Sequence, residues 1–285
     1  MLIDTHAHLN FSAYKDDLDE VIDRTLENNT WVINVGSQST TSERAVGIAN
    51  KYEEGIYAAV GLHPTHLFSV HIDESEVDVK FKSRAEDWDY EFYKKLAQDK
   101  KVVAIGEMGL DYNFIPDNVD RKTAEKKQQE VFRKGLDLAD ELDLPIIIHN
   151  RDVHDEIIPI LNEYVKNGKL KRRGVIHCYT GGWQDAERYM DLGFLIGFTG
   201  IITFSPRKNN EAQQEKILEV ARNIPMDKFM IETDCPYLTP EPNRGKRNEP
   251  LFVRYVMEKI AEIKKVTFDE IINVSTKTAR DFFKI

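Results

Sequence analysis

Eight short apolar runs, rich in β-branched residues, recur along the chain and are separated by longer segments of mixed character. The runs span residues 2–6, 31–35, 56–60, 102–106, 145–149, 174–177, 194–198 and 229–231. Between and after them, residues 120–143, 185–192, 211–223, 252–264 and 268–283 carry apolar side chains at helical spacing. Strands that alternate with helices form parallel sheets. Eight such units in 285 residues predict an α/β fold, one closed (β/α)8 TIM barrel covering residues 1–285.

Hydrophobic residues make up 41% of the chain, enough to bury a sizeable core. No apolar run reaches about 18 residues and no basic, apolar leader precedes the first strand, so we expect neither a membrane span nor a secretory signal. Two cysteines cannot build a disulfide framework, so we expect the reducing cytoplasm. The formal net charge of −10 argues against a broadly basic nucleic-acid-binding surface, although a cleft can still carry a positive field.

The first apolar run ends at His6, and His8 follows after one residue. Side chains alternate along a strand, so both imidazoles are predicted to lie on one face. Paired imidazoles fill a core poorly but are common metal ligands. Further residues of ligand type lie at or just beyond the carboxyl ends of later runs: His63, Glu107, His149, His177 and Asp234. Because barrel enzymes carry their active site at that end of the strands, these residues are predicted to meet there.

Four histidines and two carboxylates are enough to hold two divalent metal ions: His6, His8, His149, His177, Glu107 and Asp234. Mixed nitrogen and oxygen donors suit Mg²⁺, Mn²⁺, Zn²⁺ or iron, and the sequence leaves the choice open. We predict that Glu107 reaches both ions, and that Asp234 binds one ion and accepts a proton from the attacking water. Two ions outweigh the two carboxylates by about two positive charges, which suits a phosphate. These residues predict a metal-dependent hydrolase.

Several basic side chains are candidates for binding that substrate. His63 lies in the motif GLHP and is predicted to contact a phosphate or to protonate a leaving oxygen. Arg151 follows His149 by two residues and is predicted to face the same cavity. The segment 243–250, which follows the last strand, places three cations around a glycine and can bind a phosphate backbone: Arg244, Lys246 and Arg247.

These motifs resemble those of the TatD-related deoxyribonucleases, a family of the amidohydrolase superfamily. The matching stretches are DTHAHL (4–9), GLHP (61–64), GEMGLD (106–111), HNRD (149–152), HCYTGG (177–182), ETDCPYL (232–238) and RGKRNEP (244–250). The resemblance implies a TIM barrel, a divalent-metal site and hydrolysis of DNA phosphodiesters, often from the 3′ end of single strands. It assigns the six residues named above to the metal site and places His63 near the scissile phosphate. Arg151 matches a more variable position, and the segment 67–89 is longer than is usual in the family.

The leading hypothesis is a 3′–5′ exodeoxyribonuclease that acts on single-stranded DNA through a metal-activated water, with no obligate protein partner. One alternative keeps the metals and changes the bond, as in an amide or ester hydrolase such as an aminoacyl-tRNA deacylase. The basic segment 243–250 favours a phosphate-bearing substrate but does not separate DNA from RNA. The other alternative is a non-catalytic nucleic-acid-binding protein, against which the six intact ligand positions argue.

Overall fold

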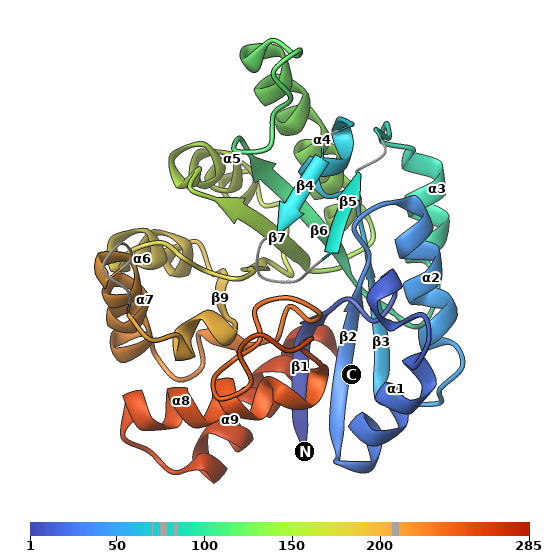
Figure 1. Cartoon of the computed structure of the whole chain (residues 1–285). Helices are drawn as coiled ribbons and strands as arrows, with labels where there is room; N and C mark the ends of the chain where they lie inside the picture. The colour runs from blue at the N-terminus through green and yellow to red at the C-terminus, as the bar shows by residue number, and fades with distance from the viewer. Residues whose placement is uncertain (70, 75–78, 83–84, 207–210) are drawn as a thin grey trace.

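Eight parallel strands form the centre of the computed structural model, which describes residues 1–69, 71–74, 79–82, 85–206 and 211–285 (Figure 1). Their bounds are Leu2–Ala7 (β1), Thr30–Val35 (β2), Ile56–Val60 (β3), Val102–Asp111 (β6), Ile146–Arg151 (β7), Gly174–Ile176 (β8), Leu195–Phe198 (β9) and Phe229–Ile231 (β10). They pair in this order, and a parallel bridge between Ala7 and Cys235 joins the two ends of the sheet. The predicted TIM barrel is confirmed, with a strand at each of the eight apolar runs.

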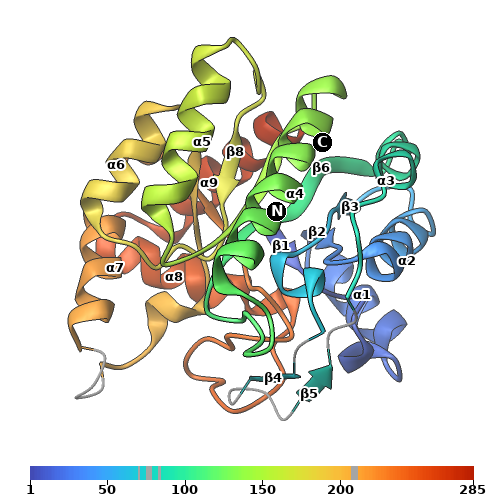
Figure 2. The ribbon, with the colours of Figure 1, turned by 90° about the horizontal axis from the view of Figure 1, so that it is seen from above.

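Helices follow the strands and cover the outside of the barrel (Figure 2). They span Leu18–Glu27 (α1), Ser39–Ala49 (α2), Tyr90–Ala97 (α3), Arg121–Glu141 (α4), His154–Lys166 (α5), Trp183–Asp191 (α6), Glu211–Asn223 (α7), Val253–Lys264 (α8) and Phe268–Phe283 (α9). Short 3-10 turns span Ser12–Tyr14 (η1), Pro64–Leu67 (η2), Gly200–Thr203 (η3) and Pro250–Phe252 (η4). The helices predicted at 211–223 and 268–283 match α7 and α9 in full. Among the described residues, none of these helices is long and apolar enough to span a bilayer.

One end of the barrel interior is filled by apolar side chains. This layer lies at the amino ends of the strands, and α9 packs against it. Its residues include Ile3, Ile33, Val103, Ile147, Val175 and Met230 from the strands and Ala279 and Phe283 from α9. A larger apolar cluster packs between the strands and the surrounding helices. Because side chains alternate along a strand, His149, two residues after Ile147, points into the same interior. His177 follows Val175 in the same way, so the histidines lie above the apolar layer.

The strand β1 brings its histidines inward by a different route. Ile3 packs in the interior layer, so strict alternation would turn His6 and His8 outward. The register of β1 on β2 shifts between Asp4 and Ala7. Through this irregularity the two imidazoles turn toward the barrel axis, where they face side chains from other strands.

The strand β6 is longer than the sequence predicted. The apolar run 102–106 predicts a strand that ends before Glu107, whereas β6 continues to Asp111 and keeps Glu107 inside the sheet. A Cβ atom added to Gly109 would lie 1.9 Å from the carbonyl oxygen of His149. The glycine therefore permits the close approach of β6 and β7, the strands that carry Glu107 and His149.

The segment 67–89, predicted as an irregular surface excursion, contains a short antiparallel hairpin. Its strands are β4 (His71–Glu74) and β5 (Val79–Lys82), which form a sheet separate from the barrel. Residues 70, 75–78 and 83–84 lie outside the described residues. The hairpin does not interrupt the barrel, because β3 pairs directly with β6.

We expect Gly109→Ala to lower the free energy of unfolding by about 3 kcal/mol, because the added methyl group collides with the backbone of β7. Gly47→Ala is the matched control, since a Cβ at this position in α2 has no heavy atom within 4 Å. That control is expected to raise stability by about 0.5–1 kcal/mol, the helix preference of alanine over glycine. Urea unfolding of both variants measures the two changes. Equal effects would contradict the tight β6–β7 approach.

Candidate metal centre

The residues predicted to bind metal meet at the carboxyl ends of the strands, with Glu107 in the middle. Its Oε1 atom is 2.8 Å from His149 Nδ1 and 3.6 Å from His63 Nε2. Its Oε2 atom is 3.5 Å from His6 Nε2 and 3.9 Å from His8 Nε2. The carboxylate therefore spans two groups of histidines, one on each oxygen.

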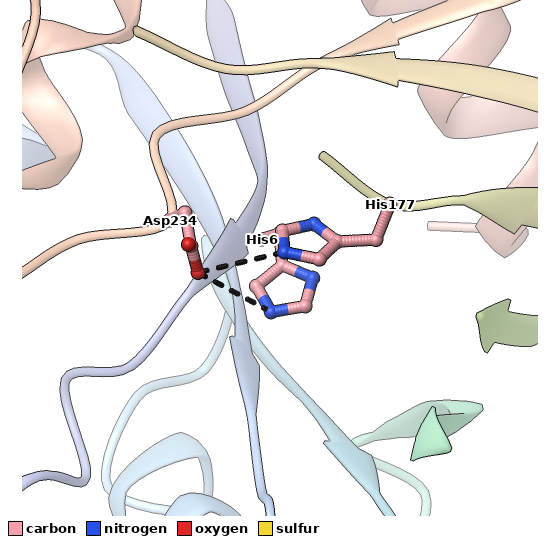
Figure 3. Close-up of side chains that lie close together, drawn as sticks. All are labelled: His6, His177 and Asp234. Atoms are coloured by element: carbon pink, nitrogen blue, oxygen red, sulfur yellow. Dashed lines mark ion pairs between the residues drawn. The ribbon is translucent and has the colours of Figure 1, made fainter. Parts of the chain in front are cut away.

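Asp234 approaches the same centre from the loop after β10. Its Oδ1 atom lies 3.3 Å from His8 Nε2, 3.8 Å from His6 Nε2 and 3.5 Å from His177 Nε2. Figure 3 shows the rings of His6 and His177 lying side by side with Asp234 facing both. The two rings are stacked, with centroids 3.5 Å apart and an interplanar angle of 20°. A single carboxylate oxygen thus faces three imidazoles.

The donor atoms fit divalent metal ions. Among the described residues, three overlapping groups each keep their donor atoms within 4.8 Å: His6, His177 and Asp234; His6, His8 and Glu107; His63, Glu107 and His149. The Nε2 atoms of His6 and His8 are 3.2 Å apart. Two ligands of one tetrahedral ion, bound at about 2.0–2.1 Å, lie about 3.3–3.4 Å apart, so this spacing suits a shared ion. Imidazole and carboxylate donors together suit several divalent ions equally well.

Opposite charges shift the pKa values inside the centre. Burial raises the pKa of Glu107, but the neighbouring His63 and His177 hold it well below its usual range. Burial lowers the pKa of His149, but its hydrogen bonds with Asp111 and Glu107 outweigh burial and raise it to about 9. An ionised carboxylate thus lies beside protonated imidazole, so protons and metal ions compete for the same nitrogen atoms.

Two buried carboxylates that the sequence analysis did not single out stand behind the histidines. Glu232 Oε1 lies 2.9 Å from His177 Nδ1 and accepts a hydrogen bond from the Cys178 N–H at 2.6 Å. Asp111 Oδ2 lies 3.1 Å from His149 Nε2. Carboxylates in such positions orient ligating imidazoles and raise their basicity. Both belong to motifs that already contain a predicted ligand, GEMGLD and ETDCPYL, and that is the signal by which they could have been found.

Asp4 fastens β1 to the loop that carries Asp234. Its Oδ1 accepts a hydrogen bond from the Thr233 N–H at 2.8 Å, and its Oδ2 accepts one from Thr233 Oγ1 at 2.6 Å. Burial raises the pKa of Asp4 to about 8, although the hydrogen bonds from Thr233 oppose this shift. The Asp234 N–H donates to the His6 carbonyl at 2.9 Å. These bonds set the Asp234 carboxylate against the imidazoles of β1.

Three of the predicted substrate-binding cations lie at the same end of the barrel, Arg151 as the last residue of β7 and Arg244 and Lys246 in the loop after β10. The guanidinium of Arg244 lies over the ring of Phe204, 3.7 Å from its centroid. The guanidinium of Arg151 lies 4.8 Å from the centroid of Phe114. Lys246 is exposed. All three remain candidates for contact with a substrate.

The fourth predicted cation, Arg247, is bound within the protein. Its guanidinium forms a two-point ion pair with Asp17, at 2.9 and 2.5 Å, and donates to the Ala13 carbonyl at 2.7 Å. It also lies 4.5 Å from the centroid of Tyr14, whose hydroxyl donates to the Asn248 carbonyl at 2.5 Å. Arg247 therefore fastens the segment 243–250 to the loop after β1, and a substrate phosphate would compete with Asp17 for it.

We expect Glu107→Gln to lower the affinity for Mn²⁺ or Zn²⁺ by about 100-fold or more, because the charge between the histidines is lost. The rise in melting temperature on addition of metal should disappear with it. Glu187→Gln makes the same chemical change at an exposed position of α6. This control should keep both the metal affinity and the rise in melting temperature on addition of metal. Calorimetric titration and thermal unfolding with and without metal measure them. An unchanged affinity in Glu107→Gln would contradict the central position of this carboxylate.

The contacts of Arg247 with Asp17 and the Ala13 carbonyl, here called the Arg247 clamp, should make the stability effects of substitutions at Arg247 and Asp17 non-additive. The two side chains are 32% and 31% exposed, so solvent screening limits the coupling to about 0.5–1 kcal/mol. Urea unfolding of Arg247→Ala, Asp17→Ala, the double variant and the parent protein measures it. The pair Arg254–Glu258 on the surface of α8 serves as the control, with an expected coupling of about 0.3 kcal/mol. Coupling no larger than that of the control would argue against the clamp.

Comparison with known proteins agrees with this arrangement. The family model described as TatD related DNase matches residues 3–284. A Bacillus subtilis (strain 168) protein named as the uncharacterized metal-dependent hydrolase YabD is 43% identical over 286 residues, which cover 100% of both chains. The protein named 3'-5' ssDNA/RNA exonuclease TatD from Erwinia tasmaniensis is 29% identical, again over 100% of both chains.

A solved structure is also similar over the whole chain. The structure described as YJJV, TatD homologue from Escherichia coli K12, has a TM-score of 0.82 and 28% sequence identity. The similarity covers 100% of this chain and 98% of that one. The fold, the donor atoms at the mouth of the barrel and the relatives agree: the chain is a metal-dependent hydrolase and belongs to the TatD-related DNase family.

Proposed function

We propose that this hydrolase is a 3′–5′ exonuclease that cleaves single-stranded DNA with divalent metal ions. The observation that carries the proposal is the centre around Glu107 and Asp234, and the loop that follows Asp234 in the chain carries Arg244 and Lys246. A phosphodiester carries the negative charge that suits such a centre, whereas a small neutral amide does not. Relatives named 3'-5' ssDNA/RNA exonuclease, at 28% and 29% identity, support the polarity and the single-stranded substrate.

We propose that six residues bind the metal ions, and the short distances among their donor atoms support this: His6, His8, Glu107, His149, His177 and Asp234. Divalent ions held there would acidify water and offset negative charge on phosphate oxygens. The protein supplies the orientation of the donors. The Nδ1 atom of His8 lies 2.8 Å from the Val35 carbonyl, which fixes the ring with Nε2 toward Asp234.

Asp234 is the proposed proton acceptor for the attacking water. Its side chain is 15% exposed, so one face of the carboxylate is open to a substrate. Burial raises the pKa of Asp234, but His177 and His8 outweigh burial and hold the pKa below its usual value. The group is therefore ionised at neutral pH, the form that a proton acceptor requires.

His63 is the proposed contact to the scissile phosphate. Its ring is 12% exposed, and its Nδ1 atom lies 2.7 Å from Thr65 Oγ1, which orients the ring. Burial lowers the pKa of His63 well below its usual value. A neutral ring favours donation of a hydrogen bond from Nε2 to a phosphate oxygen over full transfer of a proton.

Digestion of a 5′-labelled single-stranded DNA oligonucleotide tests the proposal. We expect a ladder that shortens from the 3′ end with Mg²⁺, Mn²⁺ or Zn²⁺ and is absent with EDTA. Asp234→Asn is expected to lower turnover by about 100- to 10,000-fold, the range for loss of a general base. A labelled RNA of the same sequence and a blunt duplex, run in parallel, measure the preference for sugar and strand state.

An oligonucleotide that stays intact with every metal would contradict the nuclease proposal. In that case an amide or ester hydrolase becomes the better hypothesis, and aminoacyl-tRNA is the next substrate to assay. Retained binding of the oligonucleotide without turnover would instead favour a non-catalytic nucleic-acid-binding protein.

A further inference from the structure

The ring of Phe11 stacks directly on a histidine of the metal centre. Phe11 lies in the loop after β1, and its ring is nearly parallel to the imidazole of His8, with centroids 4.3 Å apart and an angle of 7°. His8 is 3% exposed, whereas Phe11 is only partly buried. Because His8 covers one face of the phenyl ring, the accessible surface of Phe11 lies on its opposite face or its edge. A flat apolar surface thus borders the centre.

A second aromatic ring, that of Tyr237 in the loop after β10, lies next to Phe11. Tyr237 follows Asp234 by three residues, and its N–H donates to the Asp234 carbonyl at 3.0 Å. Its ring meets Phe11 edge to face, with centroids 6.3 Å apart and an angle of 66°. Tyr237 is also partly exposed. The two rings together form an aromatic corner beside His8 and Asp234.

The backbone of this aromatic corner, Phe11 and Tyr237, is hydrogen-bonded on both sides. The Phe11 N–H donates to the His8 carbonyl at 3.1 Å. The Tyr237 carbonyl accepts a hydrogen bond from Asn248 Nδ2 at 2.6 Å. Asn248 is itself fixed by Tyr14, next to the Arg247 clamp. A ligand that stacks here would find the rings already in place, so little ordering free energy would be lost on binding.

A planar ring of this kind matches one part of a nucleic acid in particular. A phosphodiester bound at the metal centre beside His8 and Asp234 carries a sugar and a base on each side, and a base is the planar apolar group next to it. Single-strand-binding proteins stack bases on aromatic side chains without regard to sequence, because every base has a π-face. Bases in a duplex are already stacked and paired, so they reach such a ring only after unpairing. Small amide or ester substrates carry no equivalent group.

We propose that Phe11 and Tyr237 form a stacking subsite for a nucleobase that flanks the scissile phosphate of single-stranded nucleic acid. The inference rests on the proposed nuclease function and adds to it a physical reason for the preference for single strands. Because stacking ignores the sugar, the subsite accepts the bases of DNA and RNA alike. The subsite also gives no preference for one base sequence over another.

Oligonucleotides that differ only in their terminal bases test the subsite. One is an ordinary single strand, and the other carries abasic sugars at its two 3′-terminal positions while it keeps every phosphate. For the parent protein we expect the ratio of kcat/KM, ordinary over abasic, to lie between about 5 and 150, the factor that corresponds to one stacked base. In Phe11→Leu and Tyr237→Leu this ratio should fall toward 1.

Two further variants separate stacking from a structural effect on His8. Phe11→Tyr restores an aromatic ring and should restore the ratio. Phe282→Leu makes the same change as Phe11→Leu at a partly buried phenylalanine at the opposite end of the barrel, and should keep the parent ratio. Calorimetric titration of Phe11→Leu with Mn²⁺ reports separately whether the metal centre is intact.

Each other outcome overturns a defined statement. Equal rates on both oligonucleotides in the parent protein would refute the subsite and leave the nuclease function standing. A Phe11→Leu variant that slows both substrates equally, with the ratio unchanged, would show that the ring only supports His8. Absence of cleavage of either oligonucleotide with any metal would refute the nuclease function itself, and the subsite with it.

Discussion

The buried carboxylate of Glu107 is the group on which the rest of the centre depends. Its side chain is 6% exposed, and five imidazoles place a nitrogen within 4.0 Å of its oxygens. A carboxylate buried without partners would be too costly to keep ionised, and buried imidazoles without a nearby anion would lose their protons or repel one another. The carboxylate and the imidazoles therefore stabilise each other's charged forms. Divalent ions are the natural replacement for the protons that the histidines share with the carboxylates.

A glycine and a buried aspartate of the barrel, Gly109 and Asp4, place these groups within reach of one another. Gly109 allows β6 and β7 to approach until no side chain would fit between them, which sets Glu107 beside His149. Asp4 ties β1 to the chain after β10, where the parallel sheet meets itself and where the ladder is reduced to an isolated bridge. The buried side chain of Asp4, with two hydrogen bonds from Thr233, replaces a longer strand pairing at this joint. The geometry at Asp234 thus follows from how the barrel closes.

Much of the fold could be predicted from the sequence because the barrel strands are buried on both faces and read as continuous apolar runs. The ligand-type residues could be predicted because they follow those runs. The shift of register in β1 could not be predicted, since nothing in the pattern Leu2 to His8 marks an irregularity. The extension of β6 past Glu107 was missed because a polar residue between glycines is typical of a loop. The roles of Glu232 and Arg247 depend on partners distant in the chain, such as Asp17, 230 residues before Arg247. A sequence identifies such charged groups but not the partners that they face.

Because α9 closes one end of the barrel, the residues that stabilise the fold and the residues that bind metal lie at opposite ends of the barrel axis. Apolar side chains, Ala279 and Phe283 among them, fill the interior at that end, while the titratable groups gather at the other. Substitutions near α9 therefore change mainly how many molecules are folded, whereas substitutions at the mouth, such as those at Gly109 or Arg247, can change both folding and activity. The loops at the mouth can consequently carry added elements, such as the separate hairpin of β4 and β5, without a new core having to be built beneath them. A substitution beside α9 therefore alters the yield of folded protein while it leaves the specific activity of each folded molecule unchanged.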